Sequence, residues 1–452
     1  MREAPPSMSS SCRPTVAEID LGACVHNLRW LRDKVGAIDI WPVVKADAYG
    51  HGAVAVATAL RAERVAGFCV ATASEGRQLR LAGIEQPVLV MVAPSASAPE
   101  DGFRMVLEYG LAVGIQDATA GARLADTARE LGLGPAAVHL KVDTGMGRLG
   151  IAPDQVTHLA RALADEPTLS FDGIFSNLAS ADSVADADPG RDFVRQQIEI
   201  FDQVCAVLEQ EGILPPHRTL ANSAGVMHHP ESWQGPTFTG VRPGLAIYGA
   251  SLTPGRGIVD LRPAMRLVTG IMAIRDLPKG VTVGYGMTAT TCKDTRVAVL
   301  PLGYHDGLPR ALSNCGWVSL AGRRAPIIGR VSMDLTLIDL TDVPDARVDD
   351  EVIVFGSATG CVRDMPGAAK SGSKGYSDTL AIALSATDEL ADEADVAAGM
   401  VPTEADGPAY VSVEEVSEWA QTIPHEVLSR IGSRVPRRYS QGADTVAGGA
   451  LR

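Results

Sequence analysis

The sequence predicts an α/β protein in which a (β/α)8, TIM-like barrel is followed by a mainly β C-terminal domain. Eight short β-rich runs alternate with helical patterns in the first half of the chain, a spacing typical of parallel βαβ units. Beyond Gly249, apolar runs alternate with turns, and few helical segments separate them. A barrel takes roughly 250 residues, so the 452 residues leave room for both domains. A doubly wound open sheet is the alternative for the first pattern.

The barrel is expected over residues 13–250, after a flexible N-terminus at 1–12. Its strands are predicted at 39–44, 67–72, 87–92, 111–115, 137–143, 171–178, 218–221 and 239–245. Helices are predicted from amphipathic or Ala/Val-rich segments at 24–35, 53–60, 74–82, 120–131 and 193–210. An opening strand at 13–20 can belong to either domain, because the sequence does not identify its partner.

The mainly β domain is expected over residues 251–452. Its strands are predicted at 265–274, 281–285, 296–302, 317–320, 327–340 and 351–355. An acidic insertion at about 357–411 interrupts it, with eight acidic residues and no Lys or Arg from 375 to 411. Part of this insertion, 380–397, can form an acidic helix, and the rest is loop-like. The domain resumes where Ser412 and Glu415 have the spacing of a helix capping box.

Composition excludes several classes of partner. A net charge of −14 and a pI near 5.1 argue against nucleic acid and anionic membranes. The seven cysteines are scattered along the sequence, which is typical of reduced thiols. The sequence contains no Cys/His cluster of the kind that indicates a metal site. The sequence contains neither an apolar leader pattern nor an 18-residue apolar run. We therefore expect a cytoplasmic protein without a bound metal or a membrane partner.

Lys45 is the strongest candidate for chemistry. It follows the apolar run from Ile40 to Val44 and precedes a glycine-rich turn that contains Tyr49. Burying an ammonium at the end of a parallel strand is costly unless its pKa falls or it bonds covalently. Both outcomes favour a nucleophilic amine that can form a Schiff base. The alternative is an ordinary surface lysine at a strand end.

Turns after other predicted strands add candidate ligand groups, because function collects at the carboxyl ends of barrel strands. Asn222 and Ser223 follow the seventh strand, and Arg242 and Gly244 lie at the eighth, where hydroxyl and backbone N–H groups suit a phosphate. Taken alone, each of these turns is more often an ordinary loop than a ligand-binding site. The fifth strand ends in His-Leu-Lys-Val-Asp-Thr-Gly-Met-Gly-Arg (139–148), whose charges can be either a site or an internal salt-bridge cluster.

The segment VVKADAYGHG (43–52) resembles the pyridoxal-phosphate lysine segment of alanine racemases. Further matches to this family are HLKVDTGMGRLG, ANSAG, VRPGLAIYG, VGYGMTAT, PLGYHDGLPR, GRVSMDLTLIDL and RVPRRY. They come in family order and cover nearly the whole chain outside the insertion. The resemblance implies pyridoxal 5′-phosphate as cofactor and a homodimer in which each active site borrows residues from its partner. It also implies interconversion of L- and D-alanine, which supplies D-alanine for peptidoglycan.

The resemblance also implies residue roles. Lys45 would be the Schiff-base lysine and one catalytic base, and Tyr285 the opposite base, delivered across the dimer interface. Groups around the phosphate would come from Tyr49, Asn222, Ser223, Gly244, Leu245 and His425. Arg242 would face the pyridine nitrogen. Because arginine does not give up its proton, this position also argues against a decarboxylase of the same plan, which uses an acidic residue there.

Substrate and access roles follow in the same way. Arg148 would reach the phenolic oxygen of the cofactor, next to the substrate. Met333 and Asp334 of the partner would line the pocket for the substrate carboxylate. The substrate corridor would be formed by Tyr304, Asp182, Arg310 and Arg330. Like charges repel, so Lys141 beside Arg148 would need neutralising. Carbamylation of Lys141 by carbon dioxide is what the family resemblance implies.

Two positions depart from the family pattern. Asn177 stands in FSNLASAD where the family usually has a histidine beside the ring, and asparagine can hydrogen-bond but cannot stack or titrate. His425 stands in TIPHEV where the family has a tyrosine at the phosphate and inner gate. A smaller side chain there leaves more room near the substrate. Alternatives to strict alanine racemisation are therefore a broader or serine/alanine racemase and a catalytically degenerate pyridoxal-phosphate-binding protein.

Overall fold

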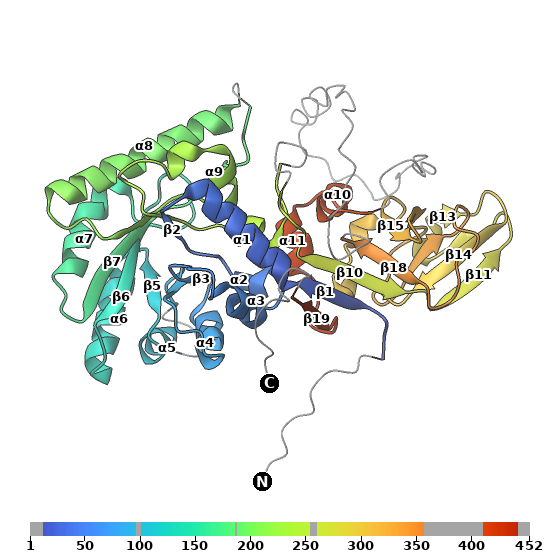
Figure 1. The fold of residues 1–452 in the computed structure, drawn as a ribbon, viewed down its shortest axis with the longest axis horizontal. Helices are drawn as coiled ribbons and strands as arrows, with labels where there is room; N and C mark the ends of the chain where they lie inside the picture. The colour runs from blue at the N-terminus through green and yellow to red at the C-terminus, as the bar shows by residue number, and fades with distance from the viewer. Residues whose placement is uncertain (1–11, 96–100, 186–187, 254–259, 357–409, 442–452) are drawn as a thin grey trace, which may run out of the picture.

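The computed structural model describes residues 12–95, 101–185, 188–253, 260–356 and 410–441. It places a barrel on one side and a mainly β domain on the other (Figure 1). Nearly all of the expected N-terminal tail and of the acidic insertion, with its possible helix at 380–397, lies outside the described residues. No helix in the described ranges is long and apolar enough to span a membrane.

The eight predicted barrel strands are all present and pair in parallel in one sheet. They are β2 (Asp39–Ile40), β3 (Phe68–Val70), β4 (Val88–Val90), β5 (Ala112–Ile115), β6 (Ala136–Lys141), β7 (Leu169–Phe175), β8 (His217–Thr219) and β9 (Gly240–Val241). A bridge between Val43 and Cys69 and a 2.9 Å hydrogen bond from Val44 N to Cys69 O join the residues after β2 to β3. The sheet is therefore closed, which confirms the barrel and excludes the open-sheet alternative.

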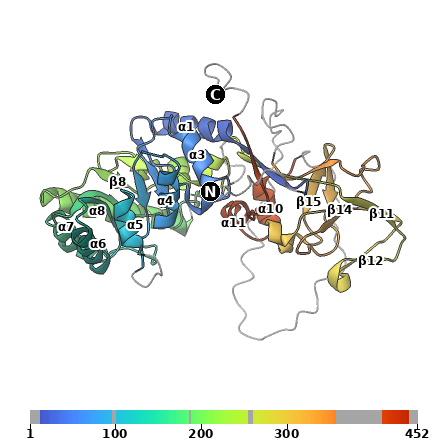
Figure 2. The same cartoon turned by 90° about the horizontal axis from the view of Figure 1, so that it is seen from below.

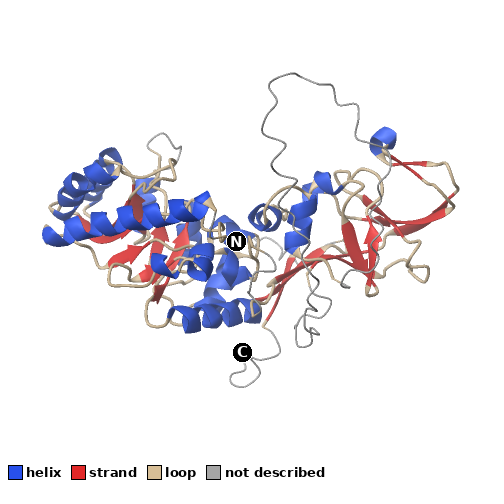
Figure 3. Ribbon diagram, turned by 90° about the horizontal axis from the view of Figure 1, so that it is seen from above, coloured by secondary structure: helices blue, strands red, loops and turns tan. Residues whose placement is uncertain are grey.

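Helices cover the barrel strands on the outside (Figure 3). The helical segments are α1 (Leu21–Val35), α2 (Lys45–Tyr49), α3 (Ala53–Leu60), α4 (Ala73–Leu81), α5 (Gly102–Glu108), α6 (Ala118–Leu131), η1 (Pro153–Gln155), α7 (Val156–Ala164), α8 (Pro189–Gln210), α9 (Ser223–His228), η2 (Pro230–Ser232) and η3 (Leu245–Tyr248). Side-chain caps set several starts: Asp20 accepts from Ala23 N, and Thr72 and Glu75 form a capping box.

The second domain is built mainly from strands. They are β10 (Met265–Gly270), β11 (Ala273–Leu277), β12 (Thr282–Val283), β13 (Ala289–Thr290), β14 (Thr295–Leu300), β15 (Trp317–Leu320), β16 (Arg323–Pro326), β17 (Thr336–Asp339), β18 (Glu351–Phe355) and β19 (Arg437–Ser440). Its helical segments are η4 (Tyr285–Met287), η5 (Tyr304–Asp306), η6 (Arg310–Leu312), α10 (Val413–Trp419) and α11 (Pro424–Ser429). The predicted capping box is confirmed: Ser412 N donates to Glu415 Oε2 (2.9 Å) and Glu415 N to Ser412 Oγ (3.1 Å).

The opening strand, β1 (Val16–Asp20), belongs to the sheet of the second domain. It pairs antiparallel with β10 and parallel with β19 in a six-stranded sheet of order β16-β15-β18-β10-β1-β19. Figure 1 shows β1 running beside β10 before α1 enters the barrel. The first described strand thus pairs with the last described strand, and the chain passes between the two domains twice, from β1 into α1 and from η3 to β10.

Two of the β-rich runs differ from their prediction. The run at 265–274 is split into β10 and β11, which lie in different sheets. The run at 327–340 is strand only over β17, whereas β16 just before it was missed. The Arg-Arg-Ala-Pro sequence of β16 shows no alternation of apolar and polar residues, so the period-two pattern gave no signal for this strand.

His139 is buried inside the barrel, 4 % exposed, between Trp41 and His217. Its ring stacks on that of His217 with centroids 5.9 Å apart and meets Trp41 edge-on at 5.9 Å. Burial lowers the pKa of His139 to about 3, assisted by the charges of His217 and Arg242. The fold therefore holds this imidazole neutral.

We expect the free energy of unfolding to fall as the pH drops from about 6.5, the ordinary histidine pKa, toward 3. In this window the unfolded chain binds a proton that folded His139 does not, so stability rises with pH. At pH 4 the shifted pKa of His139 alone lowers the free energy of unfolding by about 3 kcal/mol relative to neutral pH. Urea unfolding at a series of pH values measures this. The smaller, neutral His139→Asn variant should show a shallower dependence, and an identical dependence would contradict the assignment.

Candidate active site

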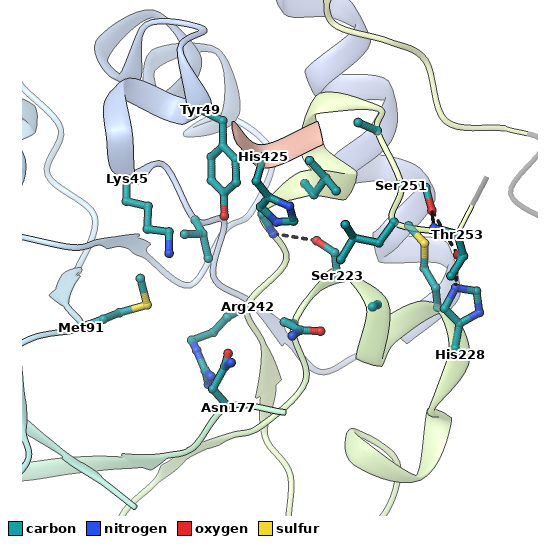
Figure 4. Close-up of a pocket in the computed structure, with 18 residues that line it drawn as sticks. Lys45, Tyr49, Met91, Asn177, Ser223, His228, Arg242, Ser251, Thr253 and His425 are labelled. Atoms are coloured by element: carbon teal, nitrogen blue, oxygen red, sulfur yellow. Dashed lines mark hydrogen bonds between the residues drawn. The ribbon is translucent and has the colours of Figure 1, made fainter. Parts of the chain in front are cut away.

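One pocket lies at the carboxyl ends of the barrel strands, where the sequence predicted a site. It brings together the predicted Lys45, Tyr49, Asn177, Asn222, Ser223, Arg242, Gly244, Leu245 and His425. In Figure 4 the Lys45 amine, the Tyr49 ring and the His425 ring line one side, and Arg242 and Asn177 lie below them. His425 comes from α11, and Figures 1 and 2 place α10 and α11 between the barrel and the strands of the second domain. The pocket is therefore built from both ends of the chain.

The turn after Lys45 has an unusual backbone. Ala46, Asp47, Ala48 and Tyr49 all have φ between 52° and 55°, so α2 contains a left-handed turn of non-glycine residues. Such a conformation costs roughly 1–2 kcal/mol per residue. Side-chain oxygens hold it: Glu75 Oε1 accepts from Ala46 N (2.7 Å) and Asp47 Oδ1 accepts from Ala53 N (2.7 Å). This turn places Lys45 and Tyr49 on the same side of the pocket (Figure 4).

The Lys45 amine is shifted toward its neutral form. Burial lowers its pKa first, the nearby Arg148 guanidinium lowers it further, and Glu75 partly opposes both. A larger neutral fraction makes an amine a better nucleophile and a better base at neutral pH. The interpretation of Lys45 as an ordinary surface lysine does not agree with this environment.

The turns after β8 and β9 form a small polar cradle. Ser223 Oγ accepts hydrogen bonds from Gly244 N (2.9 Å) and Ala246 N (3.1 Å), and Asn222 Oδ1 accepts from Gly225 N (2.9 Å). A Cβ on Gly244 would lie 2.4 Å from Tyr49 Oη, so only glycine lets the tyrosine hydroxyl approach this turn. Hydroxyl and amide donors thus face the same part of the pocket.

His425 packs beside Tyr49, with ring centroids 5.5 Å apart. Burial, and then the charge of Lys45, lowers the pKa of His425 to about 4, so the ring is neutral at physiological pH. Within the described residues its buried Nδ1 has no hydrogen-bond partner. Tyr49 also packs on Tyr248 at 4.9 Å, whose hydroxyl donates to Val43 O (2.9 Å).

Arg242 is a buried, fixed cation. Its guanidinium donates to Thr219 Oγ1 and to Ser176 O, and it lies 5.1 Å from the centroid of the Phe175 ring. Burial lowers its pKa to about 10, so it stays protonated at neutral pH. In the described part of the chain no carboxylate pairs with it, which leaves the pocket floor positive.

Asn177 is held by a network that sequence reasoning missed. Its Nδ2 donates to Leu178 O (3.1 Å), and its backbone O accepts from Gln197 Nε2 (3.2 Å). Gln197 is fully buried and also donates to Thr144 Oγ1 (3.1 Å), which lies 2.9 Å from Ser176 Oγ. No sequence signal separates Gln197 from a solvent-facing glutamine of α8, because only the packed barrel buries it.

Lys141 and Arg148 lie near the pocket but do not line it. The Lys141 amine is 5.7 Å from the Phe175 ring centroid, on the ring that also contacts Arg242. Burial lowers the pKa of Lys141 to about 8, with further lowering by Arg148, Arg242 and Lys45. Asp143 accepts from Gly145 N (3.0 Å) and from Gly147 N, and so shapes the loop that carries Arg148. The salt-bridge alternative is not favoured, because loop amides occupy Asp143.

The remaining predicted residues lie elsewhere on the chain. Within the described ranges, the pocket is not lined by Tyr285, Met333, Asp334, Tyr304, Arg310, Arg330 or Asp182. All of them are exposed, and Tyr285 is 74 % exposed at η4, next to β12. Figure 2 shows β12 at the end of the second domain that faces away from the barrel. Of the two bases that the resemblance implies, the pocket of one chain therefore contains only Lys45.

Four further pocket residues were not predicted from the sequence. Met91 lines the pocket near Lys45, and His228, Ser251 and Thr253 line its opposite end (Figure 4). His228 Nε2 lies 2.8 Å from Thr253 Oγ1, and Ser251 N donates to Glu414 of α10 (3.0 Å). These residues lie beyond the recognised motifs, so nothing in their local sequence marked them.

The chain matches two family descriptions over most of its length. Residues 19–252 match "Alanine racemase, N-terminal domain" and residues 264–379 match "Alanine racemase, C-terminal domain". An alanine racemase of Sorangium cellulosum is 38% identical over 433 residues, covering 95% of this chain and 100% of the relative. One of Symbiobacterium thermophilum is 41% identical over 349 residues, covering 77% of this chain and 89% of the relative.

Solved structures give the same result. The alanine racemase of D-cycloserine-producing Streptomyces lavendulae superimposes with a TM-score of 0.78 at 31% identity. The match covers 96% of this chain and 99% of that one. Both the barrel and the mainly β domain are therefore shared with a solved racemase.

Proposed function

This chain belongs to the alanine racemase family, and on that premise we propose that it interconverts L- and D-alanine and supplies D-alanine for peptidoglycan. The observation that carries the proposal is the half-buried Lys45 amine with a lowered pKa, in a pocket whose other wall offers hydroxyl and amide donors. Such a pairing fits a cofactor with a carbonyl at one end and a phosphate at the other.

The family depends on pyridoxal phosphate, and the pocket fits this group. Lys45 would hold its carbonyl end, and Tyr49, Ser223 and the turn at Gly244 and Leu245 would hold its phosphate. The Gly244 position supports this fit, because a Cβ there would collide with the Tyr49 hydroxyl. Arg242 would lie at the ring nitrogen and, as a lasting cation, would not donate its proton. When bound, the cofactor draws electrons from the Cα–H bond of an attached amino acid.

Racemisation needs proton removal on one face of Cα and proton delivery on the other. Lys45 would serve one face from its own chain. Tyr285 is exposed on the isolated chain, so it would serve the other face only from a neighbouring subunit. We therefore propose a homodimer with shared sites, in which Met333 and Asp334 of the partner subunit line the pocket for the substrate carboxylate and Arg148 lies close by.

The substrate would enter between the subunits, past Tyr304, Arg310 and Arg330 of one chain and Asp182 of the other. Their exposure on the single chain is compatible with this corridor. The cytoplasmic location expected from the sequence stays part of the proposal, and cell fractionation tests it.

Lys141 carbamylation also stays part of the proposal. A pKa of about 8 leaves more neutral amine at pH 7 than an ordinary lysine has. Only the neutral amine adds to carbon dioxide, and the product is an anionic carbamate plus a released proton. The new charge would suit the cations around it. Labelling with ¹³C-bicarbonate and detection of a carbamate resonance, lost in Lys141→Ala, tests this step.

The proposal is tested by incubating the purified protein with pyridoxal phosphate and L-alanine and following D-alanine by chiral separation. Alanine well ahead of other L-amino acids supports the proposed activity. Bound cofactor without any D-product from any substrate would leave the degenerate cofactor-binding alternative instead.

A second candidate is a broader serine/alanine racemase, which the environment of His425 favours. Its ring is smaller than the usual tyrosine, it is neutral, and its buried Nδ1 has no partner among the described residues. A substrate hydroxyl could satisfy that nitrogen, which a tyrosine in this position would not leave open.

Replacing His425 by tyrosine should narrow the substrate range. We expect the ratio of kcat/KM for L-serine to that for L-alanine to fall about tenfold, because one substrate group in or out of a pocket is worth a factor of this order. Alanine turnover of the same variant is the internal control. An unchanged ratio would show that His425 does not select the side chain.

A further inference from the structure

A buried carboxylate in the second domain is held by two arginines. Asp306 is 0 % exposed, and Arg13 donates to both of its oxygens at 2.9 Å. Arg434 also donates to both, at 2.6 and 3.0 Å. Burial alone would raise the pKa of Asp306, but the hydrogen bonds from Arg13 and Arg434 outweigh it and hold the pKa below its usual range. Asp306 is therefore a permanent anion.

The two arginines have different second contacts. Arg13 reaches Pro301 O, inside the same loop. Arg434 reaches outward to Asp334 Oδ1 at 2.8 Å and to Met333 O at 3.3 Å. Among the side-chain contacts of the described residues, those of Arg434 connect the buried anion to the exposed turn at 333–334.

The same turn is also held by backbone groups. Tyr304 N donates to Ser332 O (2.9 Å) and His305 N to Met333 O (3.1 Å), both from η5. On the other side, Gly432 N donates to Asp306 O (3.0 Å). The turn therefore has a fixed backbone on the η5 side, while the Asp334 side chain is oriented by Arg434.

We propose that Arg434, anchored by Asp306, is a positioning residue that fixes the Met333–Asp334 turn for binding of the substrate carboxylate. The inference rests on the proposed function, in which this turn reaches the site of the partner subunit. Arg434 follows α11 by five residues, so the segment that brings His425 to one pocket also orients the turn offered to the other. Arginine suits this task, because one planar guanidinium can donate hydrogen bonds to two carboxylates and a carbonyl oxygen.

The test compares Arg434→Lys with Arg13→Lys, the same change on two partners of one carboxylate. Lysine keeps the charge but cannot bridge several acceptors. For Arg434→Lys we expect the KM for alanine to rise about tenfold, the order of one lost charge-assisted contact, with kcat changed less than about threefold. Arg13→Lys should leave KM within about twofold of wild type. Melting temperature, cofactor absorbance and dimer mass are recorded for both variants.

Propionate binding, measured by titration calorimetry on the cofactor-loaded protein, gives a readout independent of turnover. Its affinity should fall about tenfold in Arg434→Lys and stay unchanged in Arg13→Lys. Equal affinities in the two variants, or no propionate binding by wild type, would overturn the positioning role. Wild type that binds propionate but racemises nothing would instead overturn the proposed function. If Arg434→Lys does not fold, the pair Arg434→Gln and Arg13→Gln replaces the two lysine variants, because it removes the bridging guanidinium and leaves Asp334 unchanged.

Discussion

Replacing Lys45 by alanine is expected to abolish racemisation, with a loss of about 10⁴-fold or more in kcat. A positioned acid–base group contributes up to about 10⁴-fold, and the same amine would also hold the cofactor. Among the described residues that line the pocket, Lys45 is the only primary amine, and the Arg242 guanidinium stays protonated. D-alanine formation by chiral separation measures the loss, and the visible absorbance of the cofactor shows whether it still binds.

Lys34→Ala is the matched control for this variant. Lys34 is an exposed lysine of α1, with its amine 5.5 Å from the Trp30 ring centroid, and its removal changes the net charge equally. It should retain wild-type turnover. Added methylamine should partly restore activity to Lys45→Ala, since a small amine can enter the vacated space. Substantial activity in Lys45→Ala without added amine would contradict the assigned role.

Much of the barrel was predictable because its signals are local. Each parallel strand is a short apolar run, and the helices between them bury one face, so periodicity alone located all eight strands. The place of β1 was not predictable. Its residues Val16–Asp20 alternate like any strand, and their partners lie about 250 and 420 residues further along. The assembled sheet decides which strands pair across such long sequence separations, and the sequence of β1 itself does not indicate its partners.

The sequence predicted which residues line the pocket, but not the backbone conformation and the burial of the residues around it. Lys45, Ser223 and Arg242 were found because motifs follow barrel strands and strand ends converge. The left-handed turn after Lys45 was not, because alanine and tyrosine give no signal for positive φ. The same holds for Gln197, whose burial depends on how α8 packs.

Residues that would act in the site of a second subunit can be assigned from sequence motifs, but they cannot be placed in a site from a single chain. Motif order assigned Tyr285 and Met333 to a site, while the single chain leaves both exposed. Tyr285 is 74 % exposed and Met333 is 50 % exposed, and an interface with a second subunit would cover both side chains. Their exposure therefore agrees with the proposed dimer, and the mass of the protein in solution tests it directly.

Tyr285→Phe is expected to lower interconversion of alanine about 10³-fold, within the range that one positioned acid–base group contributes. The variant keeps the aromatic ring and loses only the hydroxyl that would exchange the proton. Tyr109→Phe is the matched control. Tyr109 contacts Arg77 on the barrel and has no proposed role in the reaction, so this variant should behave as wild type.

Hydrogen exchange distinguishes loss of one base from general damage. In deuterated water, wild type should introduce deuterium at Cα of both alanine enantiomers. With Tyr285→Phe, Lys45 still faces one side of Cα, so the enantiomer whose hydrogen points to Lys45 should keep exchanging while the other stops. Mass spectrometry of each recovered enantiomer measures this. Equal slowing for both enantiomers would mean that Tyr285 supports the site without acting as the second base, and the two-base mechanism would need another proton donor.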